Sequence, residues 1–209
     1  MVRTQLRRGR GGGTGEGDID DYADVYLNAV VGATSNPLMP DPDAVDEEFA
    51  AGANRALQDA VELLRRLVPS PQSAAAIVVH GDWSSVRKFF SLSPKYAAWS
   101  TYRTPAVGVG SHRWLLDQRR PVRLTQAELE SHPAWLGFGH EAGRHPPMRG
   151  WLAAPLLDSE DVCWGLLQLS DHYAGDYTAA DEASLVRFTD LLSLTLESLW
   201  ALRGARKAS

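Results

Sequence analysis

Two short apolar runs, at residues 150–157 and 162–169, constrain the fold more than any other feature of the sequence. Each run is too short for a typical helix of a globular protein, and each is rich in large apolar residues. The four residues between them, DSED, are polar and acidic, as an exposed turn requires. This arrangement predicts an antiparallel β-hairpin, so the rest of the chain has to be arranged around a sheet.

Two amphipathic segments flank this hairpin in the sequence. Residues 45–68 carry apolar side chains at spacings of three and four, and Pro69 and Pro71 end the run. A final helix is predicted from Thr178, which can cap the first turn, with Asp181 and Glu182 placed where the helix dipole favours negative charge.

The final helix has more apolar residues than packing on a sheet requires. One stripe consists of Leu185, Phe188, Leu192, Leu196 and Leu199, and it is widened by Leu191, Leu194, Trp200 and Leu202. An apolar surface wider than one face predicts a partner helix.

The segments between the flanking helices have weaker signals. A buried strand is predicted at 74–83, and the stretch at 84–99 is ambiguous between a helical turn and an irregular loop. A short helix at 111–119 and a short strand at 121–126 follow, and 127–144 is predicted to be a long loop. Strands grouped between two helices predict an α+β fold, with an antiparallel sheet and helices packed on one face.

The length of 209 residues favours one folded domain. We expect a flexible basic arm and linker at 1–44 with a short helix at 18–31, a folded domain at 45–203 and a tail at 204–209. No apolar stretch resembles a membrane span or a secretion signal, and Cys163 is the single cysteine. A cytoplasmic location is therefore expected.

The charge of the chain is unevenly distributed. The net charge is −5, yet residues 1–17 carry +3, which leaves −8 on the remainder. An acidic body argues against duplex nucleic acid as the main partner.

The hairpin segment RGWLAAPLLDSEDVCWGLLQLSD is similar to the corresponding strand, turn and strand of GAF domains, which sense small molecules in kinases, phosphodiesterases and phytochromes. The matching features are the pair Pro155-Leu156 and the run Gly165-Leu166-Leu167-Gln168-Leu169. The similarity extends over residues 57–202 and implies a GAF-like central antiparallel sheet flanked by N- and C-terminal helices, with the GAF domain at 45–203.

The cyclic-nucleotide-binding members of that family carry an Asn-Lys pair, then Phe, then Asp-Glu. This chain has Ser170-Asp171 in place of the first pair, Tyr177 in place of Phe, and retains Asp181-Glu182. Because Asp and Glu are also favoured in the first turn of any helix, we interpret the retained pair as structural.

His145 is the most prominent candidate ligand-binding residue. Its segment, His-Pro-Pro-Met-Arg, resembles that of haem-binding GAF sensor kinases, and this resemblance implies His145 as an axial haem ligand. A Pro-Pro turn that leads into a strand also accounts for the motif without haem. A second alternative places His140, His145 and His132 around a metal ion in the loop.

The resemblance also implies a small-molecule pocket, non-catalytic regulation and a homodimer whose seam is formed by the terminal helices. It implies that these helices signal to a histidine kinase or another signalling partner. Methionine sulfoxide reduction by a GAF domain needs further cysteines beside Cys163, and no Walker or nucleophile-elbow motif occurs in the chain. The competing interpretation is an interaction module without a ligand. The predicted pocket residues are Trp114, Trp135, Phe138, His145 and Trp151.

Overall fold

The computed structural model describes residues 47–68, 71–79, 86–99, 110–137, 148–172 and 175–207, all within the compact unit Asn36–Ser209. The arm and the short helix expected at 18–31 lie outside these residues. None of the helices in this described part combines the length and the apolarity that crossing a membrane requires.

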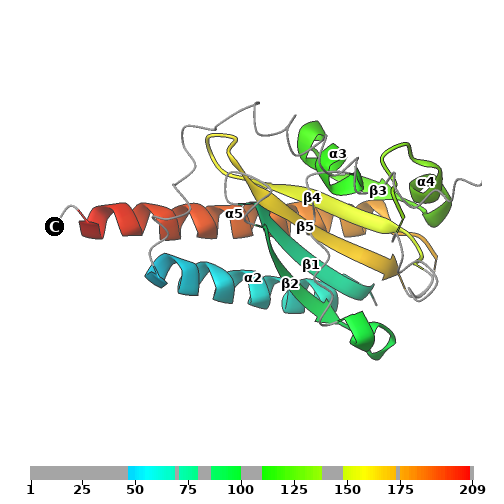
Figure 1. Ribbon diagram of the computed structural model, residues 1–209, viewed down its shortest axis with the longest axis horizontal. Helices are drawn as coiled ribbons and strands as arrows, with labels where there is room; N and C mark the ends of the chain where they lie inside the picture. Colours follow the sequence, from blue (N-terminus) through cyan, green and yellow to red (C-terminus); the bar gives the residue numbers. More distant parts are fainter. Residues whose placement is uncertain are drawn as a thin grey trace, which may run out of the picture. The chain divides into compact units, whose positions relative to one another are not determined.

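A single antiparallel sheet of five strands forms the centre of the fold, in the order β2-β1-β5-β4-β3 (Figure 1). The strands are β1 (Pro71–Val79), β2 (Val86–Leu92), β3 (Val122–Leu124), β4 (Trp151–Leu157) and β5 (Cys163–His172). The predicted hairpin is confirmed as β4 and β5. Its turn is held by Asp158, whose carboxylate accepts hydrogen bonds from the Val162 N–H at 2.7 Å and the Trp164 indole at 3.0 Å.

A β-bulge interrupts the alternation of side chains near the start of β5. Leu156 pairs with Gly165 whereas Leu157 pairs with Cys163, so Trp164 is the additional residue. Gly165 has a φ of 145°, which glycine adopts without the steric cost of a side chain. As a result Trp164 packs on one face of the sheet and Leu166 on the other, although the two residues have the same parity.

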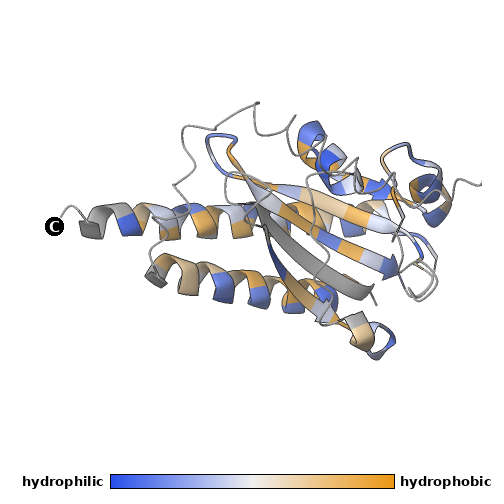
Figure 2. Cartoon of the chain, viewed as in Figure 1, coloured by the Kyte–Doolittle hydropathy of each residue, from blue (hydrophilic) through white to orange (hydrophobic). Residues whose placement is uncertain are grey.

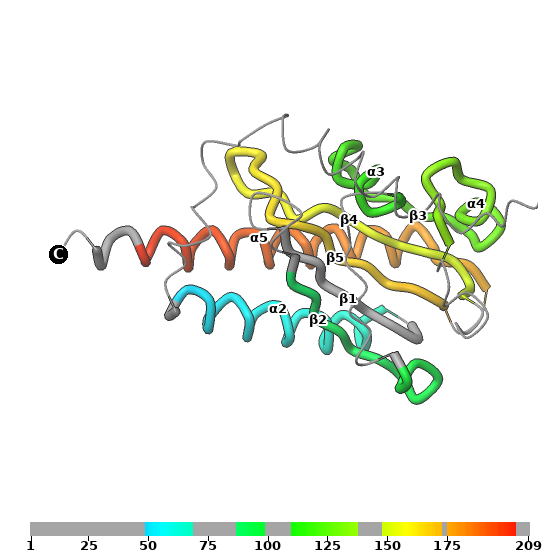
Figure 3. The backbone as a smooth tube through the Cα atoms, viewed as in Figure 1, coloured from blue at the N-terminus to red at the C-terminus, as the bar shows by residue number. Residues whose placement is uncertain are grey.

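The helices α2 (Glu47–Leu67) and α5 (Ala179–Lys207) lie side by side with opposite chain directions and cover one face of the sheet (Figures 1 and 3). The helix α2 follows the predicted span 45–68, and α5 begins after the predicted cap, since the Thr178 hydroxyl accepts from the Asp181 N–H at 3.2 Å. It continues to Lys207 and so includes part of the expected tail at 204–209. The two helices approach closely where Gly52 faces Leu199. Apolar residues recur along both helices (Figure 2), and Phe49 meets the Trp200 ring with centroids 5.0 Å apart.

The opposite face of the sheet is covered by α3 (Gly110–Gln118) and α4 (Gln126–Ser131). The two flanking helices pack on one face as predicted, and the shorter helices cover the other face, because Leu115 of α3 and Leu129 of α4 are buried in one cluster with Leu166. Part of the expected loop at 127–144 is also helical. A capping box formed by Thr125 and Glu128 starts α4.

The ambiguous stretch at 84–99 contains an edge strand, β2, and the 3₁₀ helix η3 (Pro94–Trp99). Polar side chains of β2 face α2 and bond to it. Arg87 donates to the Asn54 Oδ1 at 2.8 Å, and Ser91 accepts from the Arg65 Nε at 2.8 Å. Because these polar residues occupy positions that an apolar pattern would fill, no strand periodicity was visible in the sequence.

Candidate functional site

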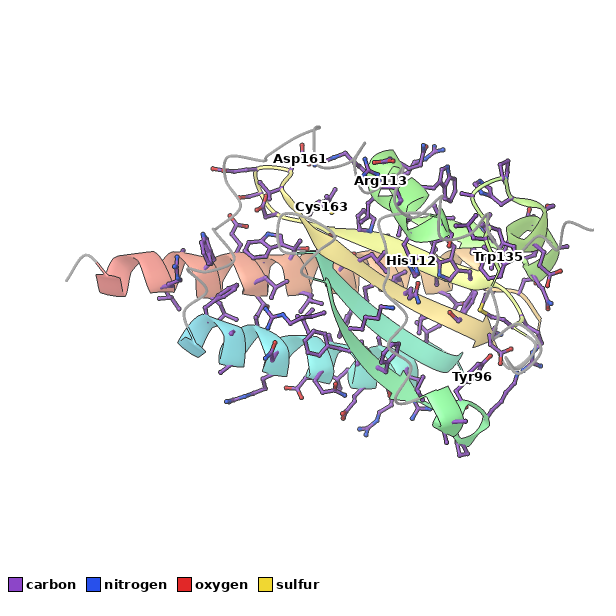
Figure 4. The ribbon with its side chains drawn as sticks, viewed as in Figure 1. Tyr96, His112, Arg113, Trp135, Asp161 and Cys163 are labelled. Atoms are coloured by element: carbon purple, nitrogen blue, oxygen red, sulfur yellow. The ribbon has the colours of Figure 1, made fainter. Side chains whose placement is uncertain are left out.

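The structure brings three of the five predicted pocket residues into one cluster, on the sheet face covered by α3 and α4. Trp151 of β4 is 3% exposed, and partly buried Trp114 and Trp135 pack against the same cluster. Figure 4 shows Trp135 after α4, with His112 nearer the middle of the sheet. The other two residues, Phe138 and His145, lie outside the described residues, so the role of His145 in haem binding stays a prediction.

At the centre of this cluster, one side-chain oxygen joins two aromatic residues. The Oε1 atom of Gln168 on β5 lies 2.9 Å from the indole Nε1 of Trp151 and 2.9 Å from the Nε2 of His112 on α3. An indole nitrogen is only a donor, so the side-chain atom of Gln168 that faces it is the oxygen. The same oxygen only accepts, and the Nε2 of His112 therefore carries a hydrogen.

His112 is held in its neutral form. Burial lowers the pKa of His112 to about 4 because the imidazolium loses its hydration, and the positive charge of Lys88 lowers it further. The hydrogen bond to Gln168 raises the pKa but does not offset burial. Near neutral pH the ring therefore has an N–H at Nε2 and a lone pair at Nδ1.

Two polar atoms of the cluster have no partner among the described residues: the Nδ1 of His112 and the amide nitrogen of Gln168. Both His112 and Gln168 are partly buried residues. The surrounding side chains of Leu115, Leu129 and Leu166 are apolar and fully or almost fully buried. A hydrogen-bond donor and an acceptor on an apolar surface are the usual means by which a protein orients a small molecule.

Local structure explains why these residues meet. His112 and Leu115 are one helical turn apart, so both lie on the face of α3 that packs on the sheet. Gln168 stands between Leu167 and Leu169, which point into the core under α2 and α5, and alternation turns Gln168 toward α3.

The third member of the alternative histidine metal site has a different environment. The His132 ring packs on the Trp114 ring with centroids 4.2 Å apart, and its Nδ1 accepts from the Ala134 N–H at 3.1 Å. Within the described ranges, no three His, Cys, Asp or Glu side chains are grouped to hold a metal ion. His140 and His145 lie outside those ranges.

A second polar centre surrounds Asp171 at the end of β5, where the resemblance expected the lysine of an Asn-Lys pair. Its side chain is fully buried and pairs with the cations of Lys95 and Arg149, and the Tyr96 hydroxyl donates to it at 3.0 Å. Burial raises the pKa of Asp171, but the hydrogen bonds from Lys95, Arg149 and Tyr96 outweigh it and hold the pKa below its usual range.

The Asp-Glu pair that follows has structural partners. The Asp181 carboxylate accepts from both the N–H and the hydroxyl of Thr178 at 2.7 Å, which completes the cap of α5. Glu182 pairs with Arg123 of β3 at 3.0 Å. Both contacts fit the structural interpretation of this pair.

The sequence interpretation missed His112, Gln168 and the partners of Asp171. A signal for Gln168 was present, since it is the one polar residue within the apolar run 162–169. No local signal marks His112, because its partner is 56 positions away along the chain.

The comparisons with known proteins agree with this architecture. The GAF domain family model matches residues 53–196, and the chain belongs to the GAF domain family. A search of curated proteins found no match to this chain.

Three solved structures illustrate the shared fold. The blue-light absorbing form of the Thermosynechococcus elongatus PixJ GAF-domain has 16% identity and a TM-score of 0.59, covering 79% of this chain and 96% of that one. The type II free methionine-R-sulfoxide reductase from Thermoplasma acidophilum has 14% identity and a TM-score of 0.55, with 72% and 96% covered. The GAF domain of a two-component sensor histidine kinase from Bacillus halodurans has 14% identity and a TM-score of 0.50, with 72% and 97% covered.

At these identities the likeness establishes the fold alone. Membership of the family supports a sensory or regulatory domain in general terms, since GAF domains are generally regulatory, although one similar structure is a reductase.

Proposed function

We propose that this GAF domain is a non-catalytic cytoplasmic sensor that binds a small molecule on the sheet face covered by α3 and α4. The observation that carries the proposal is the cluster of His112, Gln168 and Trp151, which has a donor and an acceptor without a partner among the described residues, in apolar surroundings. Trp114 and Trp135 line the same face, and the proposed pocket also includes Phe138 and His145.

A signal from the ligand to a partner protein would pass through the strands, because each strand has residues on both faces of the sheet. On β4, Trp151 and Ala153 face the proposed ligand, while Leu152 and Ala154 belong to the core beneath α2 and α5. A ligand that favours one position of β4 and β5 therefore also favours one packing of the helices. The proposed recipient is a histidine kinase or another signalling protein.

A homodimer through the terminal helices completes the proposal. Leu191 and Leu194 on α5 are 64% and 58% exposed, and Leu202 near its end is 57% exposed. Isolated exposed leucines are common, but three along one helix form a surface that a second helix can cover.

The test is a thermal-shift screen of metabolites on the purified full chain, with mass spectrometry of any small molecule that copurifies. A ligand at a hundred times its Kd stabilises the folded state by about 2.7 kcal/mol and raises the Tm. We expect Trp114→Ala to weaken that shift and Leu63→Ala, an exposed position on α2 at the other face, to leave it unchanged. A shift that both variants lose equally would contradict the proposed location.

The exposed leucines also favour a second candidate, an interaction module that binds no ligand. It predicts a dimer whose Tm no compound of the screen changes. A sensor predicts at least one compound that raises the Tm, and this result separates the two functions.

A further inference from the structure

We infer that the turn between β4 and β5, residues 158–162, couples the end of α3 to α5, so that opening of its contact with one helix loosens its contact with the other. The signalling role of this coupling rests on the proposed function, because α3 covers the proposed binding face and α5 carries the proposed dimer surface. The coupling itself belongs to the chain without a ligand. It connects the two sides of the sheet by a second route, beside the strands.

The turn contacts the end of α3 through Arg119. The Arg119 guanidinium donates to the main-chain carbonyl oxygen of Asp161, 42 positions further along the chain. Burial raises the pKa of the Cys163 thiol, and the positive charge of Arg119 opposes this effect, so the guanidinium lies near the start of β5 as well. Figure 4 shows Asp161 and Cys163 together at this end of the hairpin.

Both residues of this contact have left-handed backbone conformations. Asp161 has a φ of 63°, which aspartate tolerates, but Arg119 has a φ of 52° directly after the last residue of α3. Glycine is the usual residue at such a helix end, because a side chain makes this conformation unfavourable. The arginine therefore has a backbone cost that glycine would avoid, and its contact with the turn is what the side chain adds.

The same turn contacts α5 through Ser159. Its main-chain N–H donates to the Oε2 atom of Glu197 at 3.3 Å, and its hydroxyl donates to the Oε1 atom. Both carboxylate oxygens of Glu197 are thus bound to the turn. Glu197 lies on α5 between Leu194 and Leu202, two of the exposed leucines of the proposed dimer surface.

The turn is braced internally by Asp158. One carboxylate oxygen accepts from the N–H groups of Glu160 at 3.0 Å and Val162 at 2.7 Å, and the other accepts from the Trp164 indole at 3.0 Å. The N–H of Asp158 also donates to the carbonyl oxygen of Val162 at 3.0 Å. Networks of hydrogen bonds within a rigid element carry coupling between sites. The residues that contact α3 and α5 therefore move together.

The contacts at both ends of the turn are weak enough to open. Arg119, Ser159 and Asp161 are exposed and Glu197 is partly buried, so each bond contributes little to global stability. Segments that change state during signalling come from the parts of a fold that open locally at low free energy. The coupling is therefore expected in local opening, which amide hydrogen exchange measures, rather than in global unfolding.

The first measurement is amide hydrogen exchange by NMR on the full chain without a ligand. Arg119→Asn removes the guanidinium and keeps a residue that tolerates the left-handed conformation. We expect the N–H of Ser159, which donates to α5, to exchange at least about threefold faster in this variant. Arg120→Asn, the same change at the next exposed position, should leave the rate unchanged.

The reciprocal measurement starts from α5. Glu197→Ala removes both bonds to Ser159 and leaves a residue that favours a helix. We expect the N–H of Arg119, which donates to the Leu115 carbonyl oxygen at 3.1 Å, to exchange at least about threefold faster. Asp190→Ala, which removes an exposed carboxylate elsewhere on α5, is the control and should have no effect.

The double variant tests whether the two contacts act as a unit. Val162 lies in the turn itself, and its N–H exchange reports opening from either end. Independent contacts multiply their separate effects on this rate, whereas coupled contacts do not. We expect the rate in Arg119→Asn combined with Glu197→Ala to differ from the product of the single effects by at least about twofold. Agreement with the product, or single variants that each affect only their own end, would overturn the inference.

Failure of the inference is distinguishable from failure of the proposed function. If a metabolite raises the Tm and Trp114→Ala weakens that shift, while the two ends of the turn respond independently, the sensor stands and the inference is wrong. If the ends are coupled but no compound binds, the coupling stands and the proposed sensor is wrong.

Discussion

The Nε atom of Arg149 lies 2.9 Å from the Oδ1 of Asp171, and the main-chain N–H of Arg149 donates to the same oxygen at 3.0 Å. These two bonds join the start of the β4 segment to the end of β5. Asp171 has a φ of 62°, in the left-handed region that Asp and Asn tolerate better than most other residues. The buried carboxylate is thus compensated by neighbours from two other parts of the chain: Lys95 and Tyr96 of η3, and Arg149 before β4.

We expect Asp171→Asn to lower the free energy of unfolding by about 2–4 kcal/mol, because it removes a buried charge and leaves Lys95 and Arg149 without this partner. Urea denaturation at pH 7 measures the loss. Glu182→Gln is the control, since its pair with Arg123 is partly exposed and is expected to contribute less than about 1 kcal/mol. Equal losses in the two variants would refute the structural importance of Asp171.

His112 should make the protein less stable in mild acid. Its folded pKa of about 4 is below the ordinary 6.5, so the unfolded chain binds more protons between these values. Stability is fully present above about pH 6.5 and falls as the pH drops toward 4, by roughly 1–3 kcal/mol. Comparing urea midpoints at pH 7 and 4.5, we expect a smaller pH-dependent loss in His112→Gln. An identical loss would mean that His112 titrates normally.

The phenol of Tyr177 is buried, and its hydroxyl has no hydrogen-bond partner among the described residues. Its burial raises the pKa of Tyr177 well above the ordinary value, so the group is never charged near neutral pH. We expect Tyr177→Phe to leave stability unchanged or to raise it by up to about 1 kcal/mol, because no bond is lost. A loss above about 1 kcal/mol in urea denaturation would indicate an unrecognised partner.

The proposed dimer is tested on α5. We expect Leu191→Glu combined with Leu194→Glu to convert the dimer to a monomer, since two charges would be buried in the interface. Light scattering after size-exclusion chromatography gives the mass. Leu136→Glu is the control: that leucine, after α4, is 67% exposed, comparable to Leu191 at 64%. A double variant that keeps the wild-type mass would exclude this surface as the interface.

Alanine variants of two glycines with positive φ distinguish the cost of backbone strain from the cost of a steric clash. Gly150 has a φ of 86°, and a Cβ there would lie 3.0 Å from the Leu124 carbonyl oxygen, whereas Gly137 has a φ of 66° and open space around it. Both alanine variants incur strain of about 1–2 kcal/mol. We expect Gly150→Ala to cost at least about 1 kcal/mol more in thermal or urea denaturation, and equal costs would contradict the close approach.

Local patterns predicted the hairpin and the flanking helices because each signal lies within one element. The polar residues of β2 concealed its strand character because Arg87 and Ser91 bond to α2. The capping pair Thr125 and Glu128 was readable, but Pro133 and the glycines beyond it favoured a loop.

The polar centres could not be predicted in the same way. His112 and Gln168 are 56 positions apart, and Lys95 and Asp171 are 76 apart. No spacing rule joins such positions, because only the order of strands in the sheet and the placement of α3 and η3 bring them together. The aromatic residues of the site were easier to predict from the sequence, since large apolar side chains gather on a covered sheet face whatever their separation along the chain.

The bulge at the start of β5 places Trp164 and Gln168 on opposite faces of the sheet. Trp164 and Gln168 are four positions apart, and an ideal strand would send both to the same layer. Without the additional residue, both side chains would lie on the same face of the sheet. If both faced α3, Phe49 and Trp200 would lose the Trp164 ring as an aromatic neighbour. If both faced α2 and α5, the Gln168 amide would be buried among apolar side chains and could not contact His112. One inserted residue thus lets a single strand supply an indole to the core beneath α2 and α5 and an amide to the face covered by α3 and α4.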